Sequence, residues 1–142
     1  MGPIARIKRC AALIQPKLDE TFAQFGLSHW EFDVLATLRR SGEPCCMAPT
    51  ALFSALMVSS GTMTHRLQRL ESSGLVQRLP NENDARSMLV QLTAAGRALI
   101  DRALDAHVAN ERDILAALSP QACEKLDQML RTLLLVLEGE RA

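Results

Sequence analysis

Apolar residues recur at three- and four-residue intervals along most of the chain, which is the spacing of amphipathic helices. At the N-terminal end this spacing predicts a helix that stops at Gly26, with an apolar face formed by Ile4, Ile7, Ala11, Ile14, Leu18, Phe22 and Phe25. Ser28 and Glu31 have the spacing of a capping box, in which each side chain binds the backbone N–H of the other residue. A second helix is therefore expected from about His29 to Ser41.

Two shorter helices are predicted in the middle of the chain. Pro49 suits a first helical turn, so the segment from Pro49 to Leu56 is expected to be helical. After a turn at residues 57–58, Ser59 can cap a further helix that ends near Gly74, with an inward face formed by Met63, Leu67 and Leu70. Together these two helices form a helix-turn-helix unit, and residues 43–47 are interpreted as the connector that precedes it.

Short β-branched and apolar runs follow at residues 75–80 and 87–93, and the polar stretch 81–86 separates them. This pattern is typical of a β-hairpin with an exposed tip. Thr93 is then expected to cap a long helix that reaches about Leu118.

The last predicted helix begins at Ser119 and Pro120 and ends at Gly139. A heptad-like apolar stripe runs along it, formed by Leu126, Leu130, Leu133 and Leu137 and widened by Met129 and Leu134. The predicted fold is mostly α with a small β-hairpin wing: a winged helix-turn-helix with N- and C-terminal dimerisation helices.

A chain of 142 residues is large enough for one core, so a single domain over residues 1–142 is expected. Residues 27–93 would form the winged helix-turn-helix lobe. The flanking segments, 1–26 and 94–142, carry more apolar surface than so small a core can cover. We therefore expect them to pair with a second copy in a homodimer.

Charge and composition narrow the class of protein. The chain has 16 basic and 16 acidic residues, so it lacks the strongly basic balance of many nucleic-acid binders. Residues 59–86 are nevertheless mildly basic, whereas residues 94–142 have six basic and eight acidic groups. No apolar run is long enough for a membrane helix or a secretion signal, which predicts a soluble, cytoplasmic protein without a membrane partner.

The helix that Ser59 caps carries the groups expected to bind DNA. An α-helix fits the major groove, where hydroxyls and backbone N–H groups hold phosphates and side chains reach base edges. Hydroxyls, a glycine that permits close approach, and basic side chains all occur in this stretch. Together with the hairpin tip, the predicted double-stranded DNA-binding set is Thr50, Ser59, Ser60, Gly61, Thr62, Thr64, His65, Arg66, Arg69, Asp84 and Arg86. The alternative is that Ser and Thr serve only as helix caps.

At the hairpin tip, Arg86 is suited to a narrow minor groove, whose negative potential attracts arginine. Asp84, two residues earlier, could hold the guanidinium by a bidentate contact. An ordinary solvated turn would also contain Asn, Asp and Glu, and composition alone leaves both readings open.

These motifs resemble the multiple-antibiotic-resistance regulator (MarR) family over about residues 25–135. The matching stretches are Val58 to Glu71 with Gly74-Leu75-Val76, then Asn83 to Ser87, then Val90 to Arg97. The resemblance implies a triangular helical dimer whose recognition helices enter successive major grooves of a pseudo-palindromic operator. It also assigns Arg86 to the minor groove and Asp84 to its support. Ala85 stands where many relatives have a first arginine.

The resemblance also implies control by a small aromatic or anionic effector, and the function expected is a ligand-responsive repressor. The segments Trp30–Gly42 and Ser59–Arg66 look most like the urate-responsive branch, in which Asp33 and Arg66 would couple ligand sensing to the recognition helix. Trp30 is a possible pocket wall, although core packing is the more common role of such a residue. Asp33 could equally be a simple helix charge.

Three other functions are alternatives. A redox-responsive regulator would use Cys10 or Cys45 and Cys46; Cys10 and Cys123 are expected to be buried, and the Cys45-Cys46 loop to be exposed. A winged-helix module that binds protein is the second alternative. The third, an enzyme, is disfavoured because the sequence has no nucleophile motif, phosphate loop or metal triad.

No metal or cofactor is expected. His107 and Glu111 lie i,i+4 on one helix face, and Glu20 or His29 could complete a ligand set. A single spaced pair is a weak zinc signal. The four cysteines have no C-x-x-C spacing, which is unlike a zinc ribbon or a disulfide framework, so they are expected to be reduced thiols.

Overall fold

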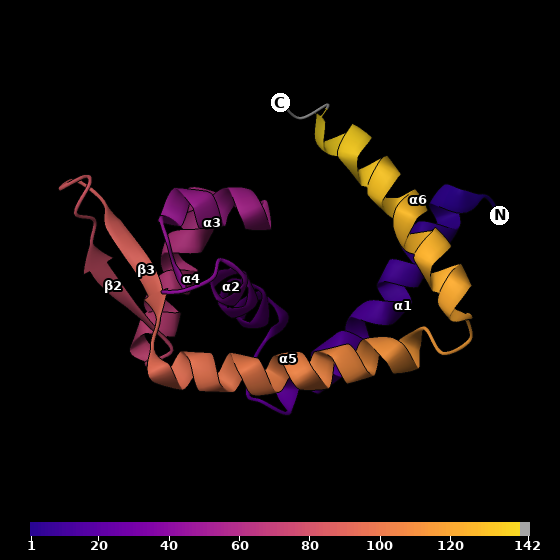
Figure 1. Cartoon of the computed structure of the whole chain (residues 1–142), viewed down its shortest axis with the longest axis horizontal. Helices are drawn as coiled ribbons and strands as arrows, with labels where there is room; N and C mark the ends of the chain where they lie inside the picture. Colours follow the sequence, from indigo (N-terminus) through magenta and orange to yellow (C-terminus); the bar gives the residue numbers. More distant parts are fainter. Residues whose placement is uncertain (140–142) are drawn as a thin grey trace. The chain divides into compact units, whose positions relative to one another are not determined.

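The computed structural model describes residues 1–139, and that range contains six helices and three short strands. Figure 1 shows their arrangement along the chain. Their order is α1 (Pro3–Ala23), α2 (His29–Arg40), β1 (Cys46–Met47), α3 (Pro49–Leu56), α4 (Ser60–Ser72), β2 (Val76–Pro80), β3 (Met88–Leu92), α5 (Ala94–Ile114) and α6 (Pro120–Gly139). The chain divides into two compact units, residues 1–108 and the residues from 109 onward. Within residues 1–139, none of the helices combines the length and apolarity that a membrane crossing requires.

The predicted helix starts are confirmed at α2 and α4. Ser28 Oγ accepts the backbone N–H of Glu31 at 3.4 Å, and Glu31 Oε1 accepts the backbone N–H of Ser28 at 3.0 Å. Ser59 Oγ accepts the backbone N–H of Thr62 at 3.3 Å. These caps supply acceptors to N–H groups that have no partner inside the helix, so they fix where each helix begins.

The sheet is antiparallel and has the order β1-β3-β2, with Gln77 opposite Gln91 and Arg78 opposite Val90. The hairpin was predicted; the third strand was not. Residues 43–47 were interpreted as a connector only, whereas Cys46 and Met47 pair with β3. Two residues are too few to show an alternating pattern, so only the tertiary pairing reveals this strand.

The core of the first unit lies where α2, α4, the sheet and α5 meet. Its fully buried side chains include Leu35 and Leu38 from α2, Met63 and Leu70 from α4, and Ile100 from α5. The predicted inward face of α4, which also contains Leu67, is therefore confirmed. Burial of this face leaves the opposite side of α4 exposed to solvent.

Two ion pairs join the end of α2 and the loop that follows it to α5. Arg39 Nε lies 2.7 Å from Asp101 Oδ1, and Arg97 pairs with Glu43. The hydrogen bond and charge of Arg97 lower the pKa of the Glu43 carboxyl. These contacts hold the loop before β1 against α5.

A compact joint connects α4, the wing and α5. Thr93 Oγ1 donates to the carbonyl oxygen of Gly74 at 2.7 Å and accepts the backbone N–H of Gly96 at 3.0 Å. Gly96 is buried, and a Cβ at this position would collide with the backbone carbonyl of Leu75. The cap predicted at Thr93 is thus present, and it binds two elements at once.

Helix α5 ends at Ile114, earlier than the predicted limit near Leu118. The backbone N–H of Leu118 bonds to the carbonyl of Leu115 at 2.9 Å in a turn, and Ser119 then caps α6 through the N–H of Ala122. The stretch after Ile114 is rich in Ala and Leu, which are good helix formers, so the sequence showed no stop before Pro120.

No residue of α6 is buried in the single chain. Its exposed apolar side chains are Met129, Leu130, Leu133, Leu134, Leu135, Val136 and Leu137. Helix α1 also exposes Ile4, Ile7 and Leu13. These are the segments predicted to pair two copies; residues 140–142 of the predicted segment 94–142 lie outside the described residues.

Candidate nucleic-acid interface

The exposed side of α4 presents a strip of polar positions. Gly61, His65, Gln68 and Ser72 follow one another at helical spacing opposite the buried face, and all four are exposed. Gly61 and His65 belong to the set predicted from the sequence, whereas Gln68 and Ser72 do not. The signal that could have found them is geometric, because they lie two turns along the same face from residues already selected.

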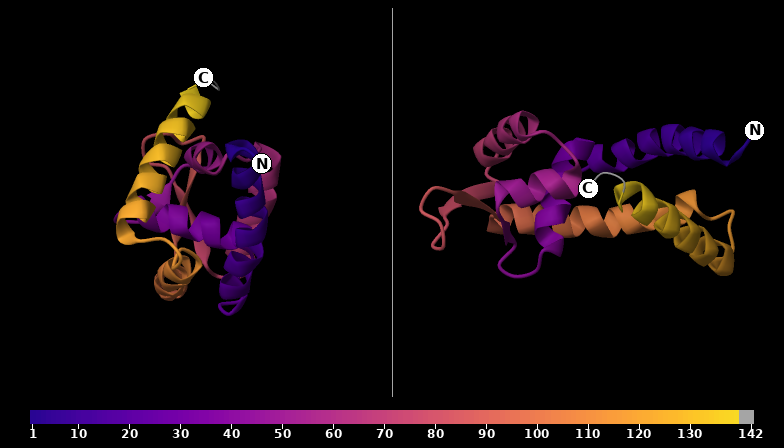
Figure 2. Two further views of the ribbon diagram at one scale, coloured as in Figure 1. Left: turned by 90° about the vertical axis from the view of Figure 1, so that its right-hand side faces the viewer. Right: turned by 90° about the horizontal axis from the view of Figure 1, so that it is seen from above.

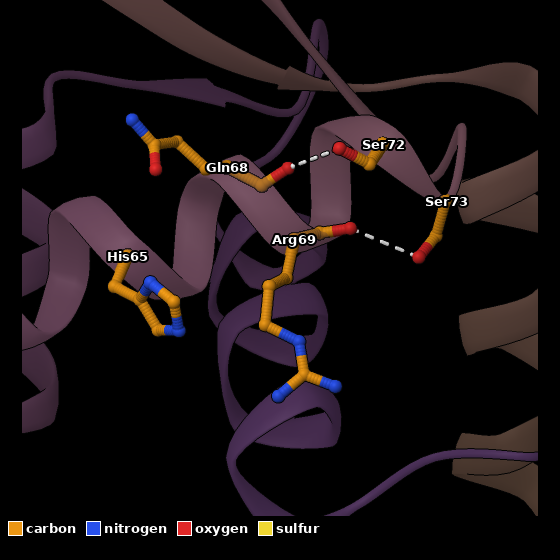
Figure 3. Close-up of a pocket in the computed structure, with 5 residues that line it drawn as sticks. All are labelled: His65, Gln68, Arg69, Ser72 and Ser73. Carbon is orange, nitrogen blue, oxygen red and sulfur yellow. Dashed lines mark hydrogen bonds between the residues drawn. The ribbon is translucent and has the colours of Figure 1, made fainter.

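The second half of this strip borders a shallow hollow of about 300 Å³, lined by His65, Gln68, Arg69, Ser72 and Ser73 (Figure 3). Ser72 Oγ donates to the backbone carbonyl of Gln68 and Ser73 Oγ to that of Arg69, both at 2.9 Å. The Gln68 amide and the Arg69 guanidinium leave the helix in different directions (Figure 3). Among these five residues, His65, Gln68 and Arg69 therefore offer the groups best placed to meet a ligand.

The hydroxyls at the start of α4 serve partly as internal caps. Ser59 Oγ donates to Thr62 Oγ1 at 2.9 Å, and Thr64 Oγ1 donates to the carbonyl of Ser60 at 2.9 Å. Ser59 thus caps α4, and its side chain is exposed at the start of the helix. The side chains of Ser60 and Thr62 are exposed, as is Thr50 in the first turn of α3.

Arg66 and Arg69 lie on the side of α4 that faces α2. Their guanidinium carbons are 5.2 Å and 5.8 Å from the ring centroid of Trp30. Both distances are within the range of cation–π contacts. Trp30 itself packs against the hydrophobic core, which confirms core packing as one of its roles.

Asp33 lies in a cationic environment on α2. Its Oδ2 atom is 3.6 Å from Nε2 of His29. Burial raises the pKa of the Asp33 carboxyl above its ordinary value, while the charges of His29, Arg40, His107 and Arg66 act in the opposite direction. The structure thus brings Trp30, Asp33 and Arg66 into one region, as the three-residue ligand set requires.

The wing tip is held by its own hydrogen bonds. Asp84 Oδ1 accepts the backbone N–H of Arg86 at 3.0 Å, and Asn81 Nδ2 donates to Ser87 Oγ at 3.0 Å. Figure 2 shows the tip projecting at one end of the lobe. The expected bidentate contact between Asp84 and the guanidinium is wrong: a short Asp side chain two residues before an N–H closes an Asx turn instead. Arg86 is exposed.

Comparison with known proteins decides the family. The MarR family model matches residues 27–88, which contain α2 to the start of β3. The transcriptional regulator PecS of Dickeya dadantii is 45% identical over 127 residues, covering 89% of this chain and 76% of PecS. The chain belongs to the MarR family. It is therefore a DNA-binding transcriptional regulator.

Solved structures of MarR-family proteins share the fold. A mutant MarR of E. coli complexed with operator DNA has a TM-score of 0.83 and 29% identity, covering 93% of this chain and 94% of that one. AbsC of Streptomyces coelicolor has a TM-score of 0.86 and 26% identity, covering 95% and 91%. The predicted winged helix-turn-helix is confirmed by these likenesses and by the element order.

None of the four cysteines has the burial expected from the sequence, and Cys46 is half-buried. Cys45 is 2% exposed, because the loop turns its side chain into the core, 4.0 Å from Nη1 of Arg39. Cys10 is exposed on α1 and Cys123 is half-buried on α6. Burial raises the pKa of the Cys46 thiol, which lowers the fraction of reactive thiolate.

His107 packs among aromatic rings. Its ring centroid is 5.3 Å from that of Phe22 and 5.0 Å from that of Phe32. Phe22 and Phe32 are themselves stacked at 4.0 Å. Within residues 1–139 no group of three or more His, Cys, Asp or Glu side chains is arranged to hold a metal ion.

Proposed function

We propose that this MarR-family regulator is a homodimeric repressor that binds a pseudo-palindromic operator and releases it when a small aromatic or anionic effector binds. The observation that carries the proposal is the polar strip on the exposed side of α4, whose opposite face is fixed in the core. The operator complex of the E. coli MarR mutant supports it by analogy. Regulation then proceeds through binding alone, without a catalytic step.

Base recognition is assigned to the strip. Gln68 carries an amide that can donate to and accept from the major-groove edge of adenine, and His65 offers ring nitrogens one turn earlier. Ser60, Thr62 and Thr64 would contact phosphates near the start of α4, where the helix dipole favours anions. Thr50, Ser59 and Gly61 complete this edge; Gly61 has open space around it, which permits close approach of the duplex.

The wing contributes the minor-groove contact. Asp84 fixes the backbone of the tip, so the Arg86 guanidinium projects from a preformed turn. A preformed loop loses less conformational entropy when it binds, which favours insertion of the side chain into a narrow groove. Asp84 thus supports Arg86 through the main chain.

The homodimer follows from the exposed apolar helices. Helix α6 presents seven large apolar side chains and α1 presents Ile4, Ile7 and Leu13 to solvent in the single chain. A second copy is the natural partner, because a two-fold axis would place two recognition helices against the two halves of a pseudo-palindrome.

Effector control is assigned to Trp30, Asp33 and Arg66. An anion that binds here would compete with Asp33 for the Arg66 guanidinium and so change the position of a side chain on the DNA-binding helix. A planar aromatic anion could also stack on Trp30. Similarity to the urate-responsive branch agrees with an effector of this chemistry.

The test of DNA binding is a salt series with the intergenic DNA beside the protein's own gene. Arg86→Ala should weaken operator binding substantially and lower the slope of log K against log salt by about 1, because one phosphate-region charge is lost. Gln68→Ala should cost about 1–3 kcal/mol and relax preference at one base pair. Arg131→Ala, a change to an exposed arginine on α6, is the matched control.

Wild-type affinity in both Arg86→Ala and Gln68→Ala would overturn the assignment of α4 and the wing. Binding that does not depend on salt would instead favour a module that binds protein, since duplex binding releases counterions. A thermal-shift screen of small aromatic acids and purines tests the effector. Arg66→Ala should abolish the response to any ligand found, and a full response would remove Arg66 from the effector site.

A further inference from the structure

Two arginines of α4 share one tryptophan ring of α2. Arg66 and Arg69 are spaced i,i+3, so their side chains leave α4 on the same side. Their guanidinium carbons lie 5.2 Å and 5.8 Å from the centroid of the Trp30 ring. We call Trp30, Arg66 and Arg69 the tryptophan clip.

The ring is a fixed platform for the two cations. Trp30 is the second residue of α2, whose first turn is closed by the reciprocal bonds of Ser28 and Glu31. The indole also packs against the buried core. An arginine side chain loses conformational entropy when binding holds it in one rotamer. A rigid aromatic support restricts the side chain before DNA binds, so less entropy is lost on binding.

The clip places positive charge beside the base-reading strip. Arg66 is half-buried and Arg69 is exposed, and both lie on the α2 side of α4, whereas Gln68 points elsewhere (Figure 3). The carboxylate of Asp33 is within electrostatic reach of Arg66. The cluster thus has two guanidiniums, and Asp33 acts on that of Arg66, so positive charge remains available for an anion.

We propose that Trp30 is a positioning residue for DNA binding: it holds Arg66 and Arg69 along the edge of α4 that faces α2, where they meet backbone phosphates and leave base reading to the strip at Gln68. This inference rests on the proposed DNA-binding role of α4. Phosphate contacts carry no sequence information, so the clip contributes affinity to every duplex equally. Specificity depends on other residues.

Fluorescence tests the clip without DNA. Trp30 is the chain's one tryptophan, so its emission reports on this ring alone. Arg66→Ala and Arg69→Ala should each change the emission maximum or intensity of the otherwise native protein. The matched control is Arg78→Ala, which removes an arginine paired with Glu71. Emission that stays unchanged in both clip variants would overturn the proposal.

Binding to operator and to unrelated duplex tests the positioning role. Trp30→Leu should weaken both by about three- to tenfold, the effect of losing two cation–π contacts, and should leave their ratio unchanged. Trp30→Phe keeps an aromatic face and should lose less. In a chain that already carries Arg66→Ala and Arg69→Ala, Trp30→Leu should cause no further loss.

If Trp30 served only to pack the core, the results would differ. The loss of DNA affinity in Trp30→Leu would add to that of the arginine variants, and Trp30→Leu and Trp30→Phe would have equal effects. Either outcome overturns the positioning role, as does a loss confined to the operator. Failure of the wild-type protein to bind any duplex would sink the proposed function and the phosphate role together. The emission of Trp30 still decides separately whether the clip exists.

Discussion

Helices α2 and α6 each carry a run of mainly apolar residues, but the run in α2 is buried and the run in α6 is exposed. Residues 34–38 of α2 are five consecutive buried positions, four of them apolar. Residues 133–137 of α6 are five consecutive apolar positions, and all are exposed in the single chain. Both runs require burial on more than one side of the helix. The lobe provides it for α2 within one chain, whereas α6 can obtain it only from another surface.

This difference separates two kinds of stability. The core of the first unit, which includes Leu35, Met63, Leu70 and Ile100, is complete in one copy. The stability that this core provides should therefore not depend on protein concentration. The apolar surface of α6 should contribute only when a partner covers it, and the stability that it adds should then rise with concentration by mass action.

The largest expected effect is on assembly. Leu133→Glu combined with Leu137→Glu places two charges where a partner would bury apolar side chains, so the dimer should dissociate and operator affinity should fall by at least about 100-fold. Analytical ultracentrifugation and far-ultraviolet circular dichroism would show monomers that retain helix. Gln128→Glu, an exposed polar position on α6, is the control. If the double variant remained dimeric, α6 would not be the helix whose apolar surface a partner covers.

The second prediction compares a buried residue of the core with an exposed residue of α6. Leu70 is fully buried, so Leu70→Ala should lower the free energy of unfolding by about 2–5 kcal/mol at every protein concentration. Leu134→Ala on α6 should lower it only in the concentration range where the wild type is dimeric. Urea titrations at two or more concentrations distinguish these cases. Equal concentration dependence in the two variants would show that the lobe is not self-contained.

The third prediction concerns two glycines in different surroundings. Gly96→Ala drives a Cβ into the Leu75 carbonyl and should destabilise the fold by about 1–3 kcal/mol. Gly61→Ala meets open space on the exposed side of α4 and should stabilise the helix by up to about 1 kcal/mol, while DNA affinity falls. Thermal unfolding and operator titration together measure both. Equal stability changes would contradict the packing described for the joint.

The smallest expected effect is that of Asp33→Asn. Burial raises the pKa of the Asp33 carboxyl above 3.8, so the folded protein binds this proton more tightly than the unfolded chain does. Stability contributed by this group is therefore lost as pH rises above 3.8. The uncharged Asn should raise Tm near neutral pH by less than about 3 °C. The gain should disappear near pH 4; a gain of equal size at both pH values would exclude this cause.

Much of the fold could be predicted because its signals are local. The capping box of Ser28 and Glu31, the cap at Ser59 and the cap at Thr93 each involve residues within one turn, and all three are present. The hairpin was also correct to within a residue at each end. Short-range hydrogen-bonding chemistry is sufficient for such features.

Several of the misses depend on tertiary contacts. Strand β1 exists only because β3 pairs with it. Cys45 is buried because its loop folds into the core, and no local pattern indicates that. In the candidate site, composition identified hydroxyls and arginines but missed Gln68, which stands out only once the buried face of α4 is known. The stacking of Trp30 under two arginines likewise requires the packing of α2 against α4.

The Thr93 hydroxyl has a further consequence for how movement is transmitted. Because it bonds both to Gly74, just after α4, and to Gly96, in the first turn of α5, neither helix can tilt there without breaking a hydrogen bond. A movement of the first turn of α5 would therefore act on the end of α4 through this joint. In a paired molecule, such a movement of α5 would change the distance between the two copies of α4.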